Sequence, residues 1–205
     1  MSEEKRLDGL SRRNFLKGVS GGVVGTAVLT SARRTSAAEQ YGDVVGPAAV
    51  KITMNVNGEK RSLEVDPRVS LLDALREQLS FTGTKRVCNK GQCGACTVIL
   101  NGRTVLACTM LAIDADGADV ETIEGLAKGD TLHPIQEQFI KHDALQCGFC
   151  TPGFIMSGVV LLRNNPSPSM DEIKDAVSGN LCRCGTYPHI FQAVNDAASA
   201  MKKGG

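Results

Sequence analysis

Every second residue from Val50 to Val56 is apolar, and the residues between them are polar. This period of two predicts a half-buried β-strand. Asn57-Gly58 follows directly and favours a tight hairpin turn. Leu63 and Val65 restore the alternation after the turn. The first patterned segment therefore predicts a β-hairpin.

A helix and a second hairpin are predicted next. Four leucines between residues 71 and 79 form one apolar helical face, and Ser70 is placed to cap that helix. Apolar residues flank Asn101-Gly102, so we expect a second hairpin with Cys108 on its return strand. Residues 120–123 are expected to add an edge strand. Two hairpins around one helix predict a mixed α+β unit that ends near residue 125.

From residue 126 onward the strand alternation disappears and helical patterns dominate. Four helices are predicted, beginning near Pro134, at Thr151-Pro152 with the threonine as cap, after Ser169, and near Pro188. Proline is tolerated in a first helical turn, and Ser169 with Glu172 forms a capping box. The connections before the second and fourth helices each hold two cysteines. These four thiols can therefore meet at one end of a helical bundle.

Residues 1–38 have the pattern of an export signal. Arg12 and Arg13 precede a weakly apolar, glycine-rich run over residues 18–30, which is typical of a Tat signal. That run is too short to span a bilayer comfortably, and the small residues up to Ala38 predict cleavage there. A basic disordered tail beside a buried apolar helix, or an uncleaved anchor, are the alternatives. We expect a periplasmic protein with no stable membrane span.

Composition and charge limit the size of the domains and the classes of partner that the protein is expected to bind. The chain has 205 residues, of which 42% are hydrophobic, and it has no tryptophan. That suits one medium domain or two small ones, and a metal often helps to stabilise so small a core. Residues 1–38 hold seven Lys/Arg and three Asp/Glu, so the remainder, with 16 and 19, has a net charge of −3. After a predicted linker at residues 39–48, this mildly acidic body gives no sign of binding nucleic acid.

The first four of the eight cysteines have the spacing C-x4-C-x2-C with a fourth after eleven further residues. They are Cys88, Cys93, Cys96 and Cys108. This is the plant-type pattern for a [2Fe–2S] cluster. Gly91 and Gly94 allow the loop to take positive φ values and bring amide N–H groups close to sulfur. Structural zinc, which favours paired C-x2-C ligands, and disulfides are the alternatives.

The other four cysteines have the spacing C-x2-C-x31-C-x-C, which is less diagnostic. They are Cys147, Cys150, Cys182 and Cys184. On spacing alone, a second [2Fe–2S] cluster, zinc and a redox disulfide all remain open. No βαβ pattern surrounds the C-x2-C pair, which argues against a thioredoxin-like motif. Disulfide bonds within such close groupings would be strained, so metal clusters are favoured for the eight cysteines together.

Nothing in the sequence predicts chemistry on a substrate by this chain. The histidines His133, His142 and His189 stand apart from any catalytic grouping, and we expect them at the surface or at helix caps. No dinucleotide fingerprint, phosphate loop or FAD motif is present. We therefore expect the substrate to react on another chain, while this one conducts electrons.

Three stretches of the chain match the motifs of one family. They are Gly83-Thr84-Lys85 with the run from Cys88 to Val98, the run from Gln146 to Gly153, and the run from Gly179 to Cys184. Over about residues 49–200 the chain resembles the iron–sulfur subunits or domains of molybdenum hydroxylases, the xanthine oxidase and aldehyde oxidoreductase group. Three motifs in the same order make this resemblance specific.

The resemblance implies a β-grasp ferredoxin-like domain at residues 49–125 and an all-α four-helix domain at residues 126–205. Each would hold one [2Fe–2S] cluster on its four cysteines. The resemblance further implies that electrons pass from a molybdopterin centre on a catalytic partner to the helical-domain cluster. They then pass to the ferredoxin-like cluster, and finally to FAD or another acceptor such as a cytochrome. Gln146 would lie against the pterin; a polar loop residue that caps a helix end is the alternative.

Two departures from the family pattern bear on the assignment. Val87 stands where many members have glycine, so the first loop must begin in a conformation that a β-branched residue allows. Gly185-Thr186-Tyr187 follows Cys184 where many members have Thr-Gly-Tyr. With the Tat-type signal, this resembles exported bacterial aldehyde oxidoreductases. A free-standing exported ferredoxin or redox-responsive binding module is the alternative function.

Overall fold

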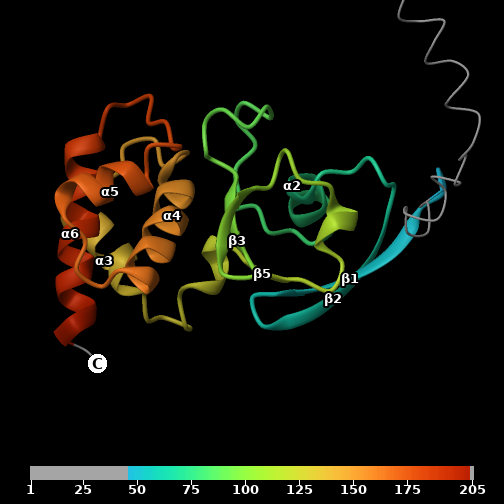
Figure 1. The fold of residues 1–205 in the computed structure, drawn as a ribbon, viewed down its shortest axis with the longest axis horizontal. Coiled ribbons are helices and arrows are strands. Elements are labelled where there is room, and N and C mark those ends of the chain that lie inside the picture. Colours follow the sequence, from blue (N-terminus) through green and yellow to red (C-terminus); the bar gives the residue numbers. More distant parts are fainter. Residues whose placement is uncertain (1–45, 204–205) are drawn as a thin grey trace, which may run out of the picture. The chain divides into compact units, whose positions relative to one another are not determined.

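The computed structural model describes residues 46–203 (Figure 1). The predicted Tat signal, with Arg12 and Arg13, and residues 39–45 of the predicted linker lie outside this range. Among the described helices, none has the length and apolar character needed to cross a membrane. We define the sheet domain as residues 50–125 and the helical domain as residues 134–203.

Both predicted hairpins are present in the sheet domain. Strand β1 (Val50–Val56) pairs antiparallel with β2 (Glu59–Val65). Strand β3 (Thr97–Leu100) pairs antiparallel with β4 (Arg103–Leu106). Both turns have an Asn-Gly sequence whose two residues have positive φ, which matches the turn type that an Asn-Gly hairpin requires. Cys108 is not on the return strand as predicted, because β4 ends at Leu106 and the chain then turns.

The strand predicted near residue 120 was wrongly expected at the edge of the sheet. Strand β5 (Asp119–Glu121) is the central strand of the order β2-β1-β5-β3-β4. It runs parallel to β1 and antiparallel to β3, so it joins the inner edges of the two hairpins. Those inner edges would otherwise bury unpaired backbone groups. Val120, at the middle of β5, is 1% exposed.

The predicted helix after the first hairpin forms with a local change of pitch. Helix α2 (Leu71–Asp73) continues into a π-helical turn over Ala74–Gln78. Ser70 caps it as predicted, since its hydroxyl accepts a hydrogen bond from the Asp73 amide at 3.1 Å. Leu71, Leu72 and Leu75 of its apolar face are fully buried in the core of the domain, and Leu79 is partly buried against that core.

The helical domain contains the four predicted helices. They are α3 (Pro134–Lys141), α4 (Thr151–Asn164), α5 (Met170–Ala176) and α6 (Tyr187–Lys203). The capping box of Ser169 and Glu172 is confirmed, and His133 caps α3 by accepting from the Ile135 amide. Thr151 is not the cap of α4. Cys150 occupies that position, and Thr151 is the first helical residue.

Helix α4 lies along the edge of the sheet domain, next to β3 in Figure 1. Ile99 of β3 is fully buried, and its side chain belongs to the core of the helical domain. Arg163 near the end of α4 forms a two-bond ion pair with Glu121 of β5, at 2.7 and 2.8 Å. These contacts fix α4 against the sheet domain.

Candidate metal centres

The first cysteine loop, which ends at β3, directs backbone amides at its thiols. The amides of Lys90 and Gln92 each donate to Cys88 Sγ at 3.4 Å. The Gly91 amide donates to Cys108 Sγ at 3.3 Å. Amide donors of this kind stabilise negative charge on cysteine sulfur. The loop is therefore built to hold thiolates.

Gly91 and Gly94 both adopt the positive φ that the sequence predicted for this loop, 69° and 68°. Gly94 is also tightly enclosed, because a Cβ added there would lie 2.5 Å from the Gly179 carbonyl oxygen. Val87 is not among the described residues with positive φ, so the first loop begins in a conformation that a β-branched side chain tolerates.

The four thiols of the first set lie near one another. Cys88 interacts with Cys93, and Cys96 interacts with both Cys108 and Cys93. Amides donating to its sulfur lower the pKa of Cys88 to about 7, whereas burial raises the pKa of Cys96 to about 12. A buried thiolate such as that of Cys96 needs a bound cation to be stable.

The second set comes from two loops that begin α4 and α6. Cys147 interacts with Cys184 and Cys182, and Cys150 interacts with Cys182 and Cys147. Burial raises the pKa of Cys150 to about 12. Burial also acts to raise the pKa of Cys182, but hydrogen bonds from Thr186, Cys150 and Cys184 together outweigh it, and the pKa falls to about 7. In each set, therefore, one thiol has a raised pKa and another has a lowered pKa.

Two residues that the sequence identified only as a departure from the family pattern hold Cys182 in place. The phenolic oxygen of Tyr187 accepts a hydrogen bond from the Cys182 amide at 2.8 Å, and Thr186 Oγ1 lies 3.2 Å from Cys182 Sγ. The Tyr187 ring packs edge-on against Phe154 of α4, with ring centroids 5.9 Å apart. Tyr187 therefore ties the cysteine loop to the helical core.

This geometry fits a [2Fe–2S] cluster on each set. Such a cluster takes four cysteine ligands, and each set supplies four thiols that interact with one another. All eight cysteines are free thiols. Within residues 46–203, no three His, Cys, Asp or Glu side chains are grouped around a single metal position. Four thiols that do not converge on one metal position suit a two-iron cluster better than one tetrahedral zinc.

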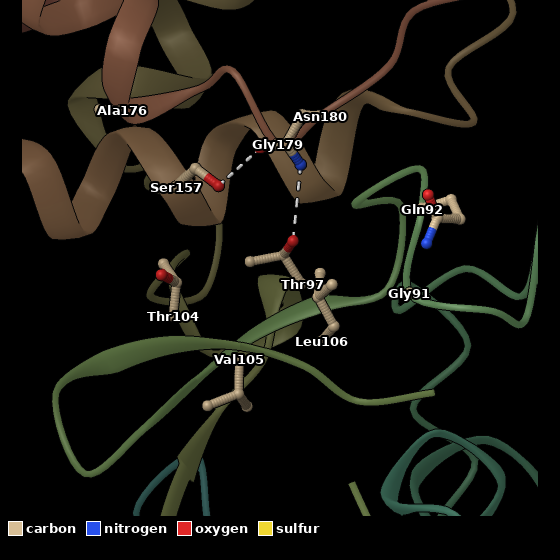
Figure 2. Close-up of a pocket in the computed structure, with 10 residues that line it drawn as sticks. All are labelled: Gly91, Gln92, Thr97, Thr104, Val105, Leu106, Ser157, Ala176, Gly179 and Asn180. Carbon is tan, nitrogen blue, oxygen red and sulfur yellow. Dashed lines mark hydrogen bonds between the residues drawn. The ribbon is translucent and has the colours of Figure 1, made fainter. Parts of the chain in front are cut away.

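The two cysteine loops contact each other directly. The Leu181 amide donates to the Cys93 carbonyl at 2.9 Å, which links a residue beside Cys182 to a cysteine of the first set. A pocket of about 270 Å³ lies along this contact. Figure 2 shows its lining, with the Asn180 side chain directed between α4 and the start of β3.

Gln146 is exposed next to Cys147. It caps neither neighbouring helix, because His142 ends α3 and Cys150 begins α4. Apolar side chains are exposed around the same loop, with Phe149 at 56% and Leu181 at 54%. The second cysteine set therefore lies beside a surface that combines a free amide side chain with apolar groups.

Family comparisons identify two domains that match this geometry. Residues 54–127 match the family described as 2Fe-2S iron-sulfur cluster binding domain, and residues 122–195 match the family described as [2Fe-2S] binding domain. The two matches cover the first and the second cysteine sets, respectively.

Curated relatives extend the similarity to most of the chain. It is 45% identical over 208 residues to the aldehyde oxidoreductase iron-sulfur-binding subunit PaoA of Escherichia coli (strain K12), covering 94% of this chain and 90% of the relative. It is 49% identical over 148 residues to the nicotine 6-hydroxylase small subunit of Paenarthrobacter nicotinovorans, covering 72% of this chain and 89% of the relative.

Solved structures confirm the predicted α+β fold, with a ferredoxin-like domain followed by a helical domain. A chain of quinoline 2-oxidoreductase from Pseudomonas putida 86 aligns with a TM-score of 0.73 at 44% identity, over 76% of this chain and 98% of that one. Aldehyde oxidoreductase from Desulfovibrio desulfuricans aligns with a TM-score of 0.73 at 47% identity, over 75% of this chain and 17% of that one.

Proposed function

The chain belongs to the iron–sulfur subunits of the molybdenum hydroxylase family, and from that membership we propose its role in a particular complex. It is an electron-transfer subunit of an oxidoreductase, and its two matching domains support two [2Fe–2S] clusters. Family membership favours this function over a free-standing ferredoxin. We propose that the complex oxidises aldehydes in the periplasm.

The ligands in this proposal are the eight cysteines. Cys88, Cys93, Cys96 and Cys108 hold the ferredoxin-like cluster, and Cys147, Cys150, Cys182 and Cys184 hold the helical-domain cluster. The observation that carries the assignment is that each set consists of four free thiols that interact with one another, with backbone amides directed at sulfur in the first loop. Four cysteines are the ligands of a [2Fe–2S] cluster. The proposed domain boundaries stay as the sequence predicts, at residues 38, 48 and 125.

Bound clusters supply one-electron transfer, and the residues of this chain set the conditions for it. Amides from Lys90, Gly91 and Gln92 point at sulfur in the first loop, and Thr186 does the same in the second. Donors to sulfur stabilise the reduced cluster because it carries more negative charge. The two loops meet at the hydrogen bond between the Leu181 amide and the Cys93 carbonyl. Electrons therefore need no further protein chain to pass between the two sets.

The partners follow from the surfaces near each set. Gln146, Phe149 and Leu181 surround the second set with exposed amide and apolar groups, which suits a permanent protein interface. We propose that the molybdopterin-binding subunit covers this surface, with Gln146 beside the pterin. The acceptor at the first set is proposed to be an FAD subunit or a cytochrome. PaoA, an aldehyde oxidoreductase subunit, is the relative that supports the aldehyde substrate class.

Export through the Tat pathway completes the proposal. The twin arginines Arg12 and Arg13 support it, and the route suits a protein that acquires its clusters before it leaves the reducing cytoplasm. Replacing both arginines with lysine should leave the chain in the cytoplasm, which fractionation of cells would detect.

Metal analysis of the purified chain tests the assignment of the clusters. Eight ligands at four for each cluster predict about four irons in each chain. Anaerobic purification followed by iron and zinc determination should give that value, with two distinguishable signals in the reduced protein by electron paramagnetic resonance. Iron sufficient for only one cluster, or zinc in the second set, would contradict the proposal.

A further inference from the structure

A buried amide side chain connects the two cysteine loops. Asn180 is 4% exposed and lies two residues before Cys182. Its Nδ2 donates to the Gly94 carbonyl at 2.9 Å and to Thr97 Oγ1 at 3.4 Å. Its Oδ1 accepts from the hydroxyl of Ser157, on α4, at 2.8 Å. One side chain of the helical domain therefore bonds both α4 and the first cysteine loop. Figure 2 shows its bonds to Ser157 and to Thr97.

The Gly94 carbonyl is the centre of this arrangement. It also accepts from the Thr97 amide at 3.1 Å and from the Thr97 hydroxyl at 2.7 Å. Gly94 lies between two cysteines of the first set, so fixing its carbonyl fixes the backbone that carries them. The peptide group is planar, and Asn180 therefore orients the amide of the next residue as well.

The packing around the carbonyl leaves no room for movement. A Cβ at Gly153, in the first turn of α4, would lie 2.2 Å from the Gly94 oxygen. A Cβ at Gly94 would lie 2.5 Å from Asn180 Nδ2. Three segments that are distant in sequence thus approach each other at backbone contact. Each of the three is within three residues of a cysteine.

Burying an amide is costly unless its polar atoms are bonded, and those of Asn180 are bonded in this structure. If this core position contributed only to stability, an apolar side chain would stabilise the fold at least as well. A fully satisfied polar network instead fixes one arrangement of the groups that it joins. The groups joined here are the two cysteine loops.

We propose that Asn180 is a positioning residue that fixes the distance and orientation between the two cysteine sets. Nδ2 holds the first loop through the Gly94 carbonyl, and Oδ1 holds α4 through Ser157. The inference rests on the proposed function in that both sets carry clusters. Asn180 binds no iron itself, and its loss leaves all eight ligands in place.

The test compares four variants of the whole, iron-loaded chain. Asn180→Ala removes the network, Ser157→Ala removes one of its hydrogen bonds, and Gly153→Ala pushes α4 away from Gly94. Thr122→Val is the control, because Thr122 is equally buried but its hydrogen bonds, to Asn57 and Glu124, join no cysteine loop. Two readouts are taken. One is amide hydrogen exchange of residues 93–97 and 180–182, and the other is the magnetic coupling between the two reduced clusters.

Asn180→Ala should keep the wild-type iron content, exchange these amides about two- to tenfold faster for each buried hydrogen bond lost, and show weaker coupling. Ser157→Ala should change both readouts less, and Gly153→Ala should change the coupling while Asn180 is present. Thr122→Val should change neither. If Asn180→Ala loses iron, the amide exchange and magnetic coupling of Ser157→Ala and Gly153→Ala test the proposal instead.

Wild-type coupling and exchange in the variants that retain iron would overturn the inference. So would an equal effect from Thr122→Val, because Asn180 would then act through general stability. A wild-type chain that lacks a second cluster would instead refute the proposed function, and the iron content of the wild type separates the two cases.

Discussion

Because Gly94 has no Cβ, the two cysteine loops can contact each other at this position. This glycine has a φ of 68°, and a Cβ there would strike both the Gly179 carbonyl and the Asn180 amide. A backbone carbonyl cannot rotate out of the way as a side chain can. Gly94 therefore needs to be glycine for both conformational and steric reasons.

Gly94→Ala should lower the free energy of unfolding by more than the roughly 1–2 kcal/mol of a left-handed alanine, because the steric contact adds to that cost. It should also reduce the iron bound by the first set. Gly102→Ala is the matched control, since Gly102 has a φ of 81° but open space around it. Thermal unfolding and iron content would check both variants. Equal losses in the two would contradict the steric argument.

Thr186 is expected to set the reduction potential of the second cluster. Its hydroxyl lies 3.2 Å from Cys182 Sγ, and it must donate once that sulfur is an iron-bound thiolate. Thr186→Val removes the donor with little change of shape. The potential of the second cluster should fall by tens of millivolts, with about 59 mV for each tenfold change in a one-electron equilibrium.

A redox titration followed by electron paramagnetic resonance would measure this shift. Thr109→Val is the control, because the Thr109 hydroxyl bonds the Leu106 carbonyl rather than a sulfur. The first cluster should keep its potential in both variants. An unchanged second potential in Thr186→Val would show that this hydroxyl does not bond to sulfur in the iron-loaded protein.

At the scale of residues, sequence spacing identified all eight cysteines and the two loop glycines as candidates. It did not identify the roles of Thr186, Tyr187 or Asn180. Cysteines that bind one cluster lie at short spacings that can be recognised in the sequence. The hydrogen bonds that Asn180 donates, in contrast, join residues that are 83 and 86 positions apart. Such bonds depend on the packing of α4 against β3, which no local pattern encodes.

At the scale of elements, capping and turn chemistry predicted most of the helices and both hairpins. The errors fell where tertiary contacts decide the outcome. Strand β5 has only three residues, so its pattern could not show that it lies between two hairpins rather than at an edge. The β4 pattern also continued past Leu106, but Cys108 turns away because its thiol approaches the first cysteine loop.

The contact between β5 and α4 predicts an effect of pH on stability. Hydrogen bonds from the Arg163 guanidinium lower the pKa of Glu121 below its ordinary value. The unfolded chain therefore binds a proton more readily than the folded chain does. Stability from this pair is present above the unfolded pKa of about 4.3, and it is lost as pH falls through the lower folded value.

Arg163→Gln should remove this part of the pH dependence. At pH 7 it should cost no more than about 1 kcal/mol, because the pair is partly exposed. Denaturant unfolding at pH 7 and below pH 4 would measure the difference. Lys174→Gln, which breaks an exposed pair within α5, is the control and should leave the slope unchanged. A wild-type pH profile in Arg163→Gln would contradict this account.

At the scale of the whole molecule, the chain joins two small domains whose cysteine loops face each other. The sheet domain contributes Ile99 to the core of the helical domain, and the loops are bonded through Leu181 and Asn180. A two-domain organisation was predicted from the change of pattern near residue 126. The direct contact of the loops was not predicted, because it arises from packing between domains.

Exposed groups at the second set explain how such a chain works within a complex. The side chains of Phe149 and Leu181 are large, apolar and more than half exposed, and Gln146 is exposed beside them. If a catalytic partner covers this surface, electrons enter at the second set and leave at the first. The central claim is therefore the order of the two sets in electron transfer.

Two cysteine variants of the complex, purified with its molybdopterin subunit, test this order most directly. After addition of an aldehyde substrate, Cys88→Ser should still show a reduced helical-domain cluster by electron paramagnetic resonance. Cys147→Ser should bind the substrate but show no reduction of the ferredoxin-like cluster and no turnover with the natural acceptor. Undiminished turnover in Cys147→Ser, with the helical-domain iron absent, would contradict the account.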